Sequence, residues 1–146
     1  MTTVSGYALD CDFCRIGRGE NTSAQIVCEG ESWLAFFPLN PATPGHTLVI
    51  PRAHVADLWH VSAAQGADLM AAVIKVGQAI DSALTPEGMN LITSAGETAE
   101  QTIFHLHLHI VPRWRLDGFG QIWPTGERYE KANLENVADR IRDRCA

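Results

Sequence analysis

The sequence lacks the features of several common protein classes. No stretch approaches the roughly 20 consecutive apolar residues that span a bilayer, and residues 1–10 have neither a basic start nor an apolar run. Positive charge is also scarce, since 11 Lys and Arg face 17 Asp and Glu and leave a formal net charge of -6. Binding to nucleic acid polymers or anionic membranes needs clustered positive charge. We therefore expect a cytoplasmic protein whose partners are neither nucleic acid polymers nor membranes.

Sequence features that separate domains are absent as well. The 146 residues contain no internal repeat, low-complexity tract or long Pro- and Ser-rich linker. With 46% hydrophobic residues the chain can bury one core, and it is too short for two ordinary domains. This predicts a single domain over residues 1–146.

Four cysteines are present, a number compatible with two disulfides. A reducing cytosol disfavours such bonds, so the close pair Cys11 and Cys14 needs another explanation. The C-x-x-C spacing is that of half a structural zinc site, and the other half must come from distant residues because no second C-x-x-C exists. A pair of free thiols and a redox-active pair are the alternatives. We expect Cys28 to be a small buried hydrophobic residue and Cys145 a free thiol near the chain end.

Hydrophobic periodicity predicts an α+β fold. Short β-branched and aromatic runs, bounded by Gly and Pro, predict five strands at residues 25–29, 33–37, 46–50, 89–93 and 103–111. Apolar residues at three- and four-residue spacing predict a long helix that begins at Ser62, with Gln65 completing a capping box, and ends before Pro86. The same spacing predicts a C-terminal helix capped by Asn133. Because the strands lie before and after the long helix, we expect a mostly antiparallel sheet of about five strands with helices on one face.

Three histidines alternate with apolar residues in the last predicted strand, as His105-Leu106-His107-Leu-His109. Successive side chains of a strand point to opposite faces, so the three imidazoles share one face and the leucines share the other. Pro112 is expected to close this strand. Each imidazole titrates near neutrality and offers both a donor and an acceptor, which indicates chemistry rather than an ordinary exposed face.

The central histidine is the candidate nucleophile. A neutral imidazole nitrogen can attack phosphorus when its other nitrogen donates to an acceptor that fixes the tautomer. We expect His107 to take up a nucleotidyl group that water then removes, with His109 and His46 making polar contacts around it. A metal site is the rival interpretation, because His105, His107 and His109 could together hold a catalytic metal that activates water.

Several further segments accompany the triad. They are Cys11-Asp-Phe-Cys14-Arg-Ile16 with Gly19-Glu20, Leu34-Ala35-Phe36, Pro44-Gly45-His46-Thr-Leu-Val-Ile-Pro51-Arg-Ala-His54, Gln101-Thr102-Ile-Phe-His105 and Asp117-Gly-Phe-Gly-Gln-Ile-Trp123. With them the chain resembles the histidine triad family of nucleotide hydrolases and transferases over most of its length, in its bacterial zinc-containing type. A histidine at position 109, where the related uridylyltransferases have Gln, favours the hydrolase-like branches.

The resemblance implies a nucleotide or nucleoside polyphosphate as ligand. It implies a phosphate-binding turn before the triad in which Gln101 and Thr102 contact the phosphate, and it matches His46 to the family's fourth histidine. The nucleobase pocket would be lined by Phe13, Ile16, Phe36 and Leu39. Arg113 and Arg115 are interpreted as solvated surface charges without a role.

The resemblance also implies a homodimer and a structural zinc. By comparison with the zinc-containing members, the zinc ligands would be Cys11, Cys14, His54 and His105. Such a site would pin the N-terminal segment to the triad and leave His107 free for phosphorus.

Three positions depart from the family pattern. The family often has Asp at the position of Pro38, where it accepts hydrogen bonds from the ribose, and Asn40 is the nearby substitute. Glu100 replaces a more usual Gly in the phosphate turn, although Glu tolerates the backbone angles of Gly poorly. Ser94, also expected in the nucleotide site, stands where many relatives have Asn. These changes predict an unusual substrate or weak activity.

Three functions are compatible with these patterns. The first is a hydrolase or nucleotidyl transferase that acts at the α-phosphate of a dinucleoside polyphosphate or a nucleoside phosphoramidate through a nucleotidyl-His107 intermediate. The second is a non-catalytic nucleotide-binding module, which the residues Pro38 and Glu100 motivate. The third is a metal-dependent hydrolase that uses the histidine row as ligands.

Overall fold

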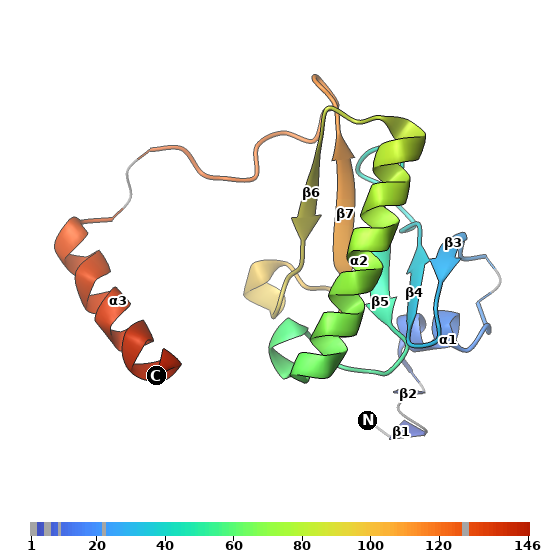
Figure 1. The fold of residues 1–146 in the computed structure, drawn as a ribbon, viewed down its shortest axis with the longest axis horizontal. Helices are drawn as coiled ribbons and strands as arrows, with labels where there is room; N and C mark the ends of the chain where they lie inside the picture. The colour runs from blue at the N-terminus through green and yellow to red at the C-terminus, as the bar shows by residue number, and fades with distance from the viewer. Residues whose placement is uncertain (1–2, 5–6, 9, 22, 127–128) are drawn as a thin grey trace.

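Five strands form one sheet in the computed structural model, which describes residues 3–4, 7–8, 10–21, 23–126 and 129–146. In spatial order they are β3 (Ile26–Glu29), β4 (Trp33–Phe36), β5 (Thr47–Pro51), β7 (Leu108–Arg113) and β6 (Gly88–Ile92). Every neighbouring pair is antiparallel, and Figure 1 shows the strands behind one long helix. The predicted α+β fold with about five antiparallel strands is therefore confirmed.

The long helix α2 (Ala63–Leu84) covers one face of this sheet. The predicted capping box is present, because the Gln65 N–H donates to the Ser62 hydroxyl and the Ser62 N–H donates to the Gln65 side chain. The helix ends at Leu84 and is capped by Thr85, whose backbone is left-handed with φ of 45°, and Pro86 follows. The side chains between helix and sheet form one buried cluster that includes Leu69, Val73, Val76, Ala35, Val49, Leu108 and Ile110.

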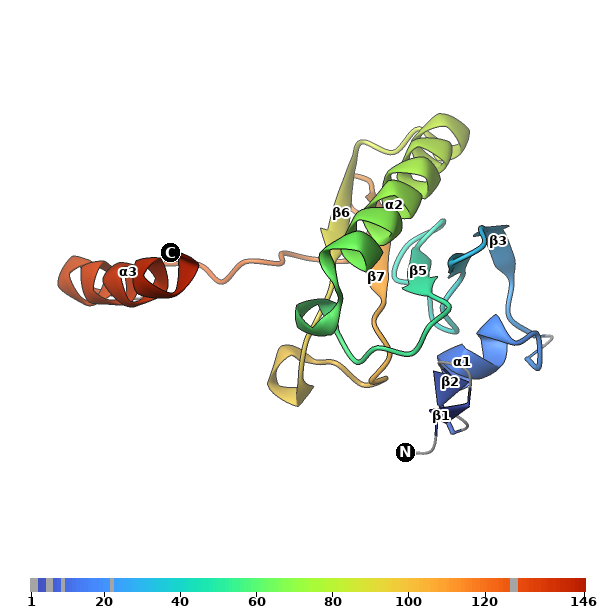
Figure 2. The same cartoon turned by 60° about the horizontal axis from the view of Figure 1, so that its bottom comes forward.

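A short helix, α1 (Asp12–Gly17), covers the opposite face and was not predicted. Its apolar side chains join a second buried cluster, which includes Phe13, Ile16, Leu34, Phe36, Leu48 and Ile50. Helices therefore lie on both faces of the sheet and not on one, as Figure 2 shows for α1 and α2. Six residues are too few for a helical period to stand out in a sequence. Two-residue strands β1 (Thr3–Val4) and β2 (Tyr7–Ala8) pair just before α1.

The strand that carries the histidines begins later than predicted. β7 starts at Leu108, so His105 and His107 precede it and only His109 lies within it. Neither neighbouring strand pairs with the residues before Leu108. The pairing of β5 with β7 begins at Leu108, and the pairing of β6 with β7 begins at His109. The predicted alternation still holds, because Leu106 and Leu108 both lie in the cluster beneath α2.

Pro112 lies within β7, opposite Met89, and does not close the strand as predicted. β5 pairs with β7 only as far as Ile110. The side of β7 that faces β5 is therefore unpaired at Pro112. Proline has no backbone N–H, and on this unpaired side that absence removes no hydrogen bond between strands.

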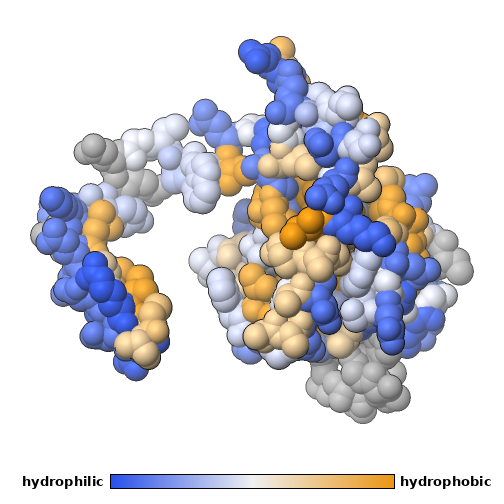
Figure 3. Space-filling view, in the orientation of Figure 1, coloured by the Kyte–Doolittle hydropathy of each residue, from blue (hydrophilic) through white to orange (hydrophobic). Residues whose placement is uncertain are grey.

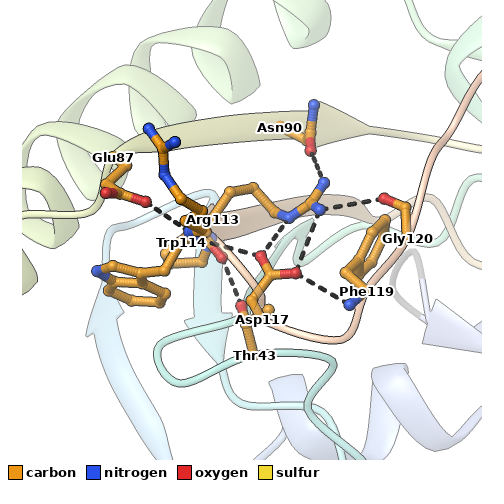
Figure 4. A network of polar contacts seen from close by, with 10 residues as sticks. Thr43, Glu87, Asn90, Arg113, Trp114, Asp117, Phe119 and Gly120 are labelled. Atoms are coloured by element: carbon orange, nitrogen blue, oxygen red, sulfur yellow. Dashed lines mark hydrogen bonds and ion pairs between the residues drawn. The ribbon is translucent and has the colours of Figure 1, made fainter.

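Arg113 is not the solvated surface charge that the sequence suggested. Its guanidinium donates to the Asp117 carboxylate at 2.6 and 3.3 Å, to the Asn90 side-chain oxygen at 2.8 Å and to the Gly120 carbonyl at 3.1 Å (Figure 4). It also lies 4.3 Å from the ring centroid of Phe119. The Arg113 hydrogen bond lowers the pKa of Asp117 to about 2. This cluster fixes the direction in which the chain leaves β7.

After this cluster residues 118–126 run away from the sheet, and α3 (Lys131–Cys145) lies apart from it (Figure 1). The predicted cap is wrong, because the N-cap is Glu130 and Asn133 lies inside the first turn, where its N–H donates to the Glu130 carbonyl at 3.1 Å. The helical spacing of apolar residues begins only at Leu134, so the sequence did not indicate that residues 131–133, the polar first turn, already belong to α3. Within the described ranges, no helix has the length and apolar character needed to cross a membrane.

Candidate active site and metal centre

Four side chains from three separate segments meet at the start of α1. The ligand atoms of Cys11, Cys14, His54 and His105 all lie within 4.8 Å of one another. His105 Nδ1 is 3.5 Å from each sulfur, and Cys14 Sγ is 3.4 Å from His54 Nδ1. These are the four residues predicted as zinc ligands. In the part of the chain that the structure describes, no other group of three or more His, Cys, Asp or Glu residues is close enough to hold a metal.

The chemistry of these donors fits a divalent cation. Burial raises the pKa of the Cys14 thiol to about 11, so a thiolate there needs a positive partner. Burial lowers the pKa of His105 to about 4, and its Nε2–H donates to the Pro51 carbonyl at 2.8 Å. That bond leaves the Nδ1 lone pair aimed at the sulfurs. Two sulfurs and two imidazoles are a common tetrahedral zinc set.

His107 is oriented by the backbone of the neighbouring histidine. Its Nδ1–H donates to the His105 carbonyl at 2.7 Å, so Nε2 carries the lone pair. Burial lowers the pKa of His107, which keeps the ring neutral at pH 7. The Phe13 ring meets it edge-on, with centroids 5.2 Å apart. One nitrogen held and the other free is the arrangement that a nucleophile at phosphorus requires.

A second chain of hydrogen bonds fixes the tautomers of His46 and His109. The Ala42 N–H donates to His46 Nδ1 at 2.9 Å, so the His46 proton sits on Nε2. That Nε2–H donates to His109 Nδ1 at 2.9 Å, which places the His109 proton on its own Nε2. Burial lowers the pKa of both rings, that of His109 to about 4. His109 is therefore neutral at pH 7 and can donate a hydrogen bond from Nε2.

His107 and His109 form part of the wall of a cavity of about 640 Å³. The cavity lies on the α1 side of the sheet, opposite α2. Of the residues predicted to contact a nucleotide, those that line it are Phe13, Ile16, Phe36, Leu39, Asn40, Thr102, His107 and His109. The volume is in the range of ordinary small-ligand sites, which run from about 300 to 1,000 Å³.

The turn before the triad differs in detail from the prediction. The Gln101 side chain is buried and engaged by its own loop, accepting from the Gly96 N–H at 2.9 Å and donating to the carbonyls of Ala56 and Ile103 at 2.7 and 3.1 Å. It therefore shapes the turn and, unlike Thr102, does not line the cavity.

Two other predicted positions, Ser94 and Glu100, do not lie in the cavity wall. Ser94 is half-buried. Glu100 adopts φ of 67°, a left-handed backbone conformation that glycine accepts more easily. The expectation that Glu tolerates the backbone angles at position 100 poorly thus has a geometric basis.

The rival interpretation, in which the three histidines share one metal, does not fit the geometry. His105 Nδ1 faces Cys11 and Cys14, while the Nδ1 of His107 is used by a backbone carbonyl. Neither His107 nor His109 belongs to the group of possible metal ligands found among the described residues. The histidine row therefore divides into one member at the metal group and two at the cavity.

Some cavity residues were missed. Asp12 and Asn21 contribute polar groups to the wall, and Leu48 and Ile103 contribute apolar ones. Asp12 lies between the two cysteines, where the C-x-x-C spacing drew attention only to the sulfurs. Asn21 belongs to no motif, so only the path of the chain after α1 brings it to the cavity.

Comparison with known proteins identifies relatives of the chain. The family model of the HIT domain matches residues 19–116. Protein hit of Bacillus subtilis is 38% identical over 141 residues, which cover 95% of this chain and 97% of that protein. Adenosine 5'-monophosphoramidase hnt1 of Schizosaccharomyces pombe is 35% identical over 138 residues, 92% of this chain and 100% of that protein. Adenylylsulfatase HINT3 of Arabidopsis thaliana is 35% identical over 108 residues, 74% of this chain and 54% of that protein.

Solved structures share the fold. The crystal structure of SMU.412c from Streptococcus mutans aligns with 100% of this chain and 92% of its own, with a TM-score of 0.90 and 36% identity. A Zn-bound histidine triad family protein from Mycobacterium smegmatis aligns with 94% of this chain and 99% of its own, with a TM-score of 0.71 and 32% identity. The domain match, the identities and the cysteine and histidine cluster agree, and the chain belongs to the histidine triad (HIT) family, with residues that fit its zinc-containing type.

Proposed function

We propose that this chain is a nucleotide hydrolase or nucleotidyl transferase that acts at an α-phosphate through His107. The observation that carries the proposal is the 2.7 Å hydrogen bond from His107 Nδ1 to the His105 carbonyl, which leaves Nε2 free at the wall of the cavity. In the first step the Nε2 lone pair forms a bond to the α-phosphorus. The P–O or P–N bond to the leaving group breaks, and the leaving group departs with the bonding electrons, an amine leaving group having taken up a proton from solvent.

The second step releases the nucleotide. A water oxygen attacks the same phosphorus and loses a proton to solvent, the phosphorus–Nε2 bond breaks, and the electron pair returns to Nε2 of His107. The His109 Nε2–H, fixed by His46, donates a hydrogen bond to the oxygen or nitrogen on which negative charge develops. Because the rings of His46 and His109 are both neutral at pH 7, this hydrogen bond can form without either ring first taking up a proton.

The cavity wall supports a division of nucleotide contacts. Phe13, Ile16, Phe36 and Leu39 would enclose the base. Asn40 would contact the ribose in place of the carboxylate that the family often has at position 38, and Thr102 would contact the phosphate. Gln101 would act by holding the turn in shape.

The metal group would have a structural role. Cys11, Cys14, His54 and His105 would hold a zinc ion that ties α1 to the segment carrying His107. The Zn-bound relative from Mycobacterium smegmatis supports this assignment. Since the His105 carbonyl holds His107, a rigid His105 also keeps the nucleophile in place.

The chain would act as a homodimer, as the family resemblance implies. β6 is an edge of the sheet, and its exposed side chains include Met89 and Leu91. An apolar edge of this kind pairs readily with another chain.

Two relatives guide the choice of substrate. They are named for adenosine 5'-monophosphoramidase and adenylylsulfatase activities. Both names favour a nucleoside monophosphate unit that carries a small leaving group, over a long polyphosphate. The altered residues Pro38 and Glu100 would tune which leaving group or nucleoside is preferred.

The test compares His107→Ala with His60→Ala on a panel of adenosine phosphoramidate, adenylyl sulfate and diadenosine polyphosphates. His60 is an exposed histidine outside the cavity, so it serves as the matched control. We expect His107→Ala to lose turnover while adenosine monophosphate still binds, and His60→Ala to keep both. Turnover by His107→Ala at the parent rate would contradict the nucleophile assignment. Binding without turnover by the unaltered chain on every substrate would favour a non-catalytic binding module.

A further inference from the structure

Two polar side chains lie beside the apolar part of the cavity. Asp12 begins α1 directly before Phe13, and Asn21 follows the end of that helix. Both line the same cavity as Phe13 and Ile16, which would enclose the base. The contacts proposed above for the phosphate and the ribose do not involve either residue. A mostly apolar ligand site uses a few polar groups to select its ligand, so these two side chains are placed to read the polar edge of a base.

The Asp12 carboxylate is available to a ligand. Its side chain is 71% exposed, and Arg15 is its one charged partner among the described residues, with Nη1 3.8 Å from Oδ1. That separation is longer than a hydrogen bond, and an exposed pair of this length holds its partners weakly. A carboxylate accepts hydrogen bonds at both of its oxygens and donates none. Asp12 therefore offers two adjacent acceptors at the cavity.

The Asn21 amide presents the opposite chemistry. Its Oδ1 accepts from the Ser23 N–H at 3.1 Å and from the Ser23 hydroxyl at 2.7 Å. A backbone N–H can only donate, so these bonds fix which end of the amide is the oxygen. In the part of the chain that the structure describes, the Asn21 Nδ2 group makes no hydrogen bond. Asn21 therefore offers a donor at the cavity, because its acceptor is already used.

Guanine matches this pair of groups better than the other bases do. Its Watson–Crick edge has two adjacent donors, N1–H and the 2-amino group, next to the O6 acceptor. The two oxygens of one carboxylate can accept from both donors, while an amide NH₂ donates to O6. The same edge of adenine has a single donor beside the N1 lone pair, which a carboxylate repels. Cytosine also has a single donor, and uracil has one donor between two carbonyl oxygens.

We propose that this chain selects a guanine nucleotide, with Asp12 accepting from N1–H and the 2-amino group and Asn21 Nδ2 donating to O6. This inference rests on the nucleotide function proposed above and adds the base that the site prefers. The rings of Phe13 and Phe36, which meet edge-on with centroids 5.3 Å apart, are available to either purine. Adenine nucleotides therefore remain substrates, although they make fewer hydrogen bonds. A two-point contact of this kind predicts that guanosine monophosphate (GMP) binds about 10-fold more tightly than adenosine monophosphate (AMP).

Titration calorimetry of the full, zinc-loaded chain with GMP and AMP tests the selection, because binding of these nucleotides requires no turnover. Two variants each change one hydrogen-bonding group with little change of shape. Asp12→Asn replaces one acceptor by a donor, so it should weaken GMP binding about 10-fold and favour xanthosine monophosphate, which has a carbonyl in place of the 2-amino group. Asn21→Asp keeps an acceptor for Ser23 and removes the donor to O6, so the preference for GMP over AMP should fall about 10-fold.

The matched control is Asp68→Asn. It removes the same charge as Asp12→Asn, from an exposed residue of α2 that does not line the cavity. Figure 3 looks onto the face that α2 covers, opposite the cavity. We expect this variant to keep the parent's preference for GMP. Asn21→Asp lies apart from the two cysteines that flank Asp12, so it tests the selection without altering the metal group.

Equal affinity of the parent for GMP and AMP, or an unchanged preference in both cavity variants, would overturn the proposal. Either result would leave the proposed bond breaking at His107 intact, because that step is tested by turnover. Conversely, an active His107→Ala would remove the nucleophile and leave the selection of guanine unchanged.

Discussion

Arg52 should stabilise the cavity wall from a distance, and its replacement by Met tests this. The side chain follows β5 and donates to the Gly17 carbonyl at the end of α1 at 3.0 Å and to the Gly30 carbonyl at 3.2 Å. It also pairs with Glu29 at 2.6 Å. Each carbonyl bond contributes about 1 to 1.5 kcal/mol, and the pair with the exposed Glu29 about 0.5 kcal/mol. The total is about 3 kcal/mol, which corresponds to a fall in Tm of about 6 to 12 °C for a chain of this size.

The same change should weaken substrate binding more than catalysis. Phe13 and Ile16 of α1 line the cavity, whereas His107 is held from a different segment. If about 1 kcal/mol of the lost contact energy falls on α1, Arg52→Met raises KM about fivefold with little change in kcat. Arg15→Met is the control, because Arg15 is an exposed α1 residue whose pair with Asp12 is 3.8 Å long. Equal Tm and KM in the two variants would refute this account of Arg52.

Three further perturbations have defined outcomes. Zinc at 1,000-fold excess over its Kd would stabilise the fold by about 4 kcal/mol, so chelation should lower Tm by about 8 to 16 °C, while loss of activity at unchanged Tm would indicate a catalytic metal instead. His46→Ala frees the proton position of His109, so kcat should fall about 10- to 100-fold with unchanged nucleotide affinity, and an unchanged kcat would remove His46 from the mechanism. Burial lowers the pKa of His109 from its ordinary 6.5 to about 4. Between pH 6.5 and 4 the unfolded chain therefore binds a proton at this histidine that the folded chain does not bind, so the free energy of unfolding falls as the pH falls. His109→Gln should therefore lose less Tm between pH 6.5 and 4 than the parent, and identical slopes would contradict this.

Local signals in the sequence were sufficient for much of the fold. The Ser62 and Gln65 pair predicted the start of α2, and the strands β3 to β6 were found within a residue or two. Such features depend on contacts between near neighbours. The six residues of α1 were missed because their helix is stabilised by burial of Phe13 and Ile16 against strands far away in the sequence.

The candidate site divides in the same way. The alternation of His105, His107 and His109 predicted that one face carries imidazoles, and their order along the chain suggested the central one as nucleophile. Which ring meets the metal group and which meets the cavity depends on the Pro51 carbonyl and on α1, and these contacts join distant segments. The internal hydrogen bond of Gln101 could not be predicted for the same reason, since its partner Ala56 lies 45 residues away.

The most direct measurement is mass spectrometry of the chain quenched in base during turnover of adenosine phosphoramidate or adenylyl sulfate. We expect an adenylyl group on the peptide that contains His107, attached to that residue and absent in His107→Ala. The adduct should decay as free nucleotide appears. Rapid turnover with no adduct at any time, or an adduct on another residue, would contradict the role of His107.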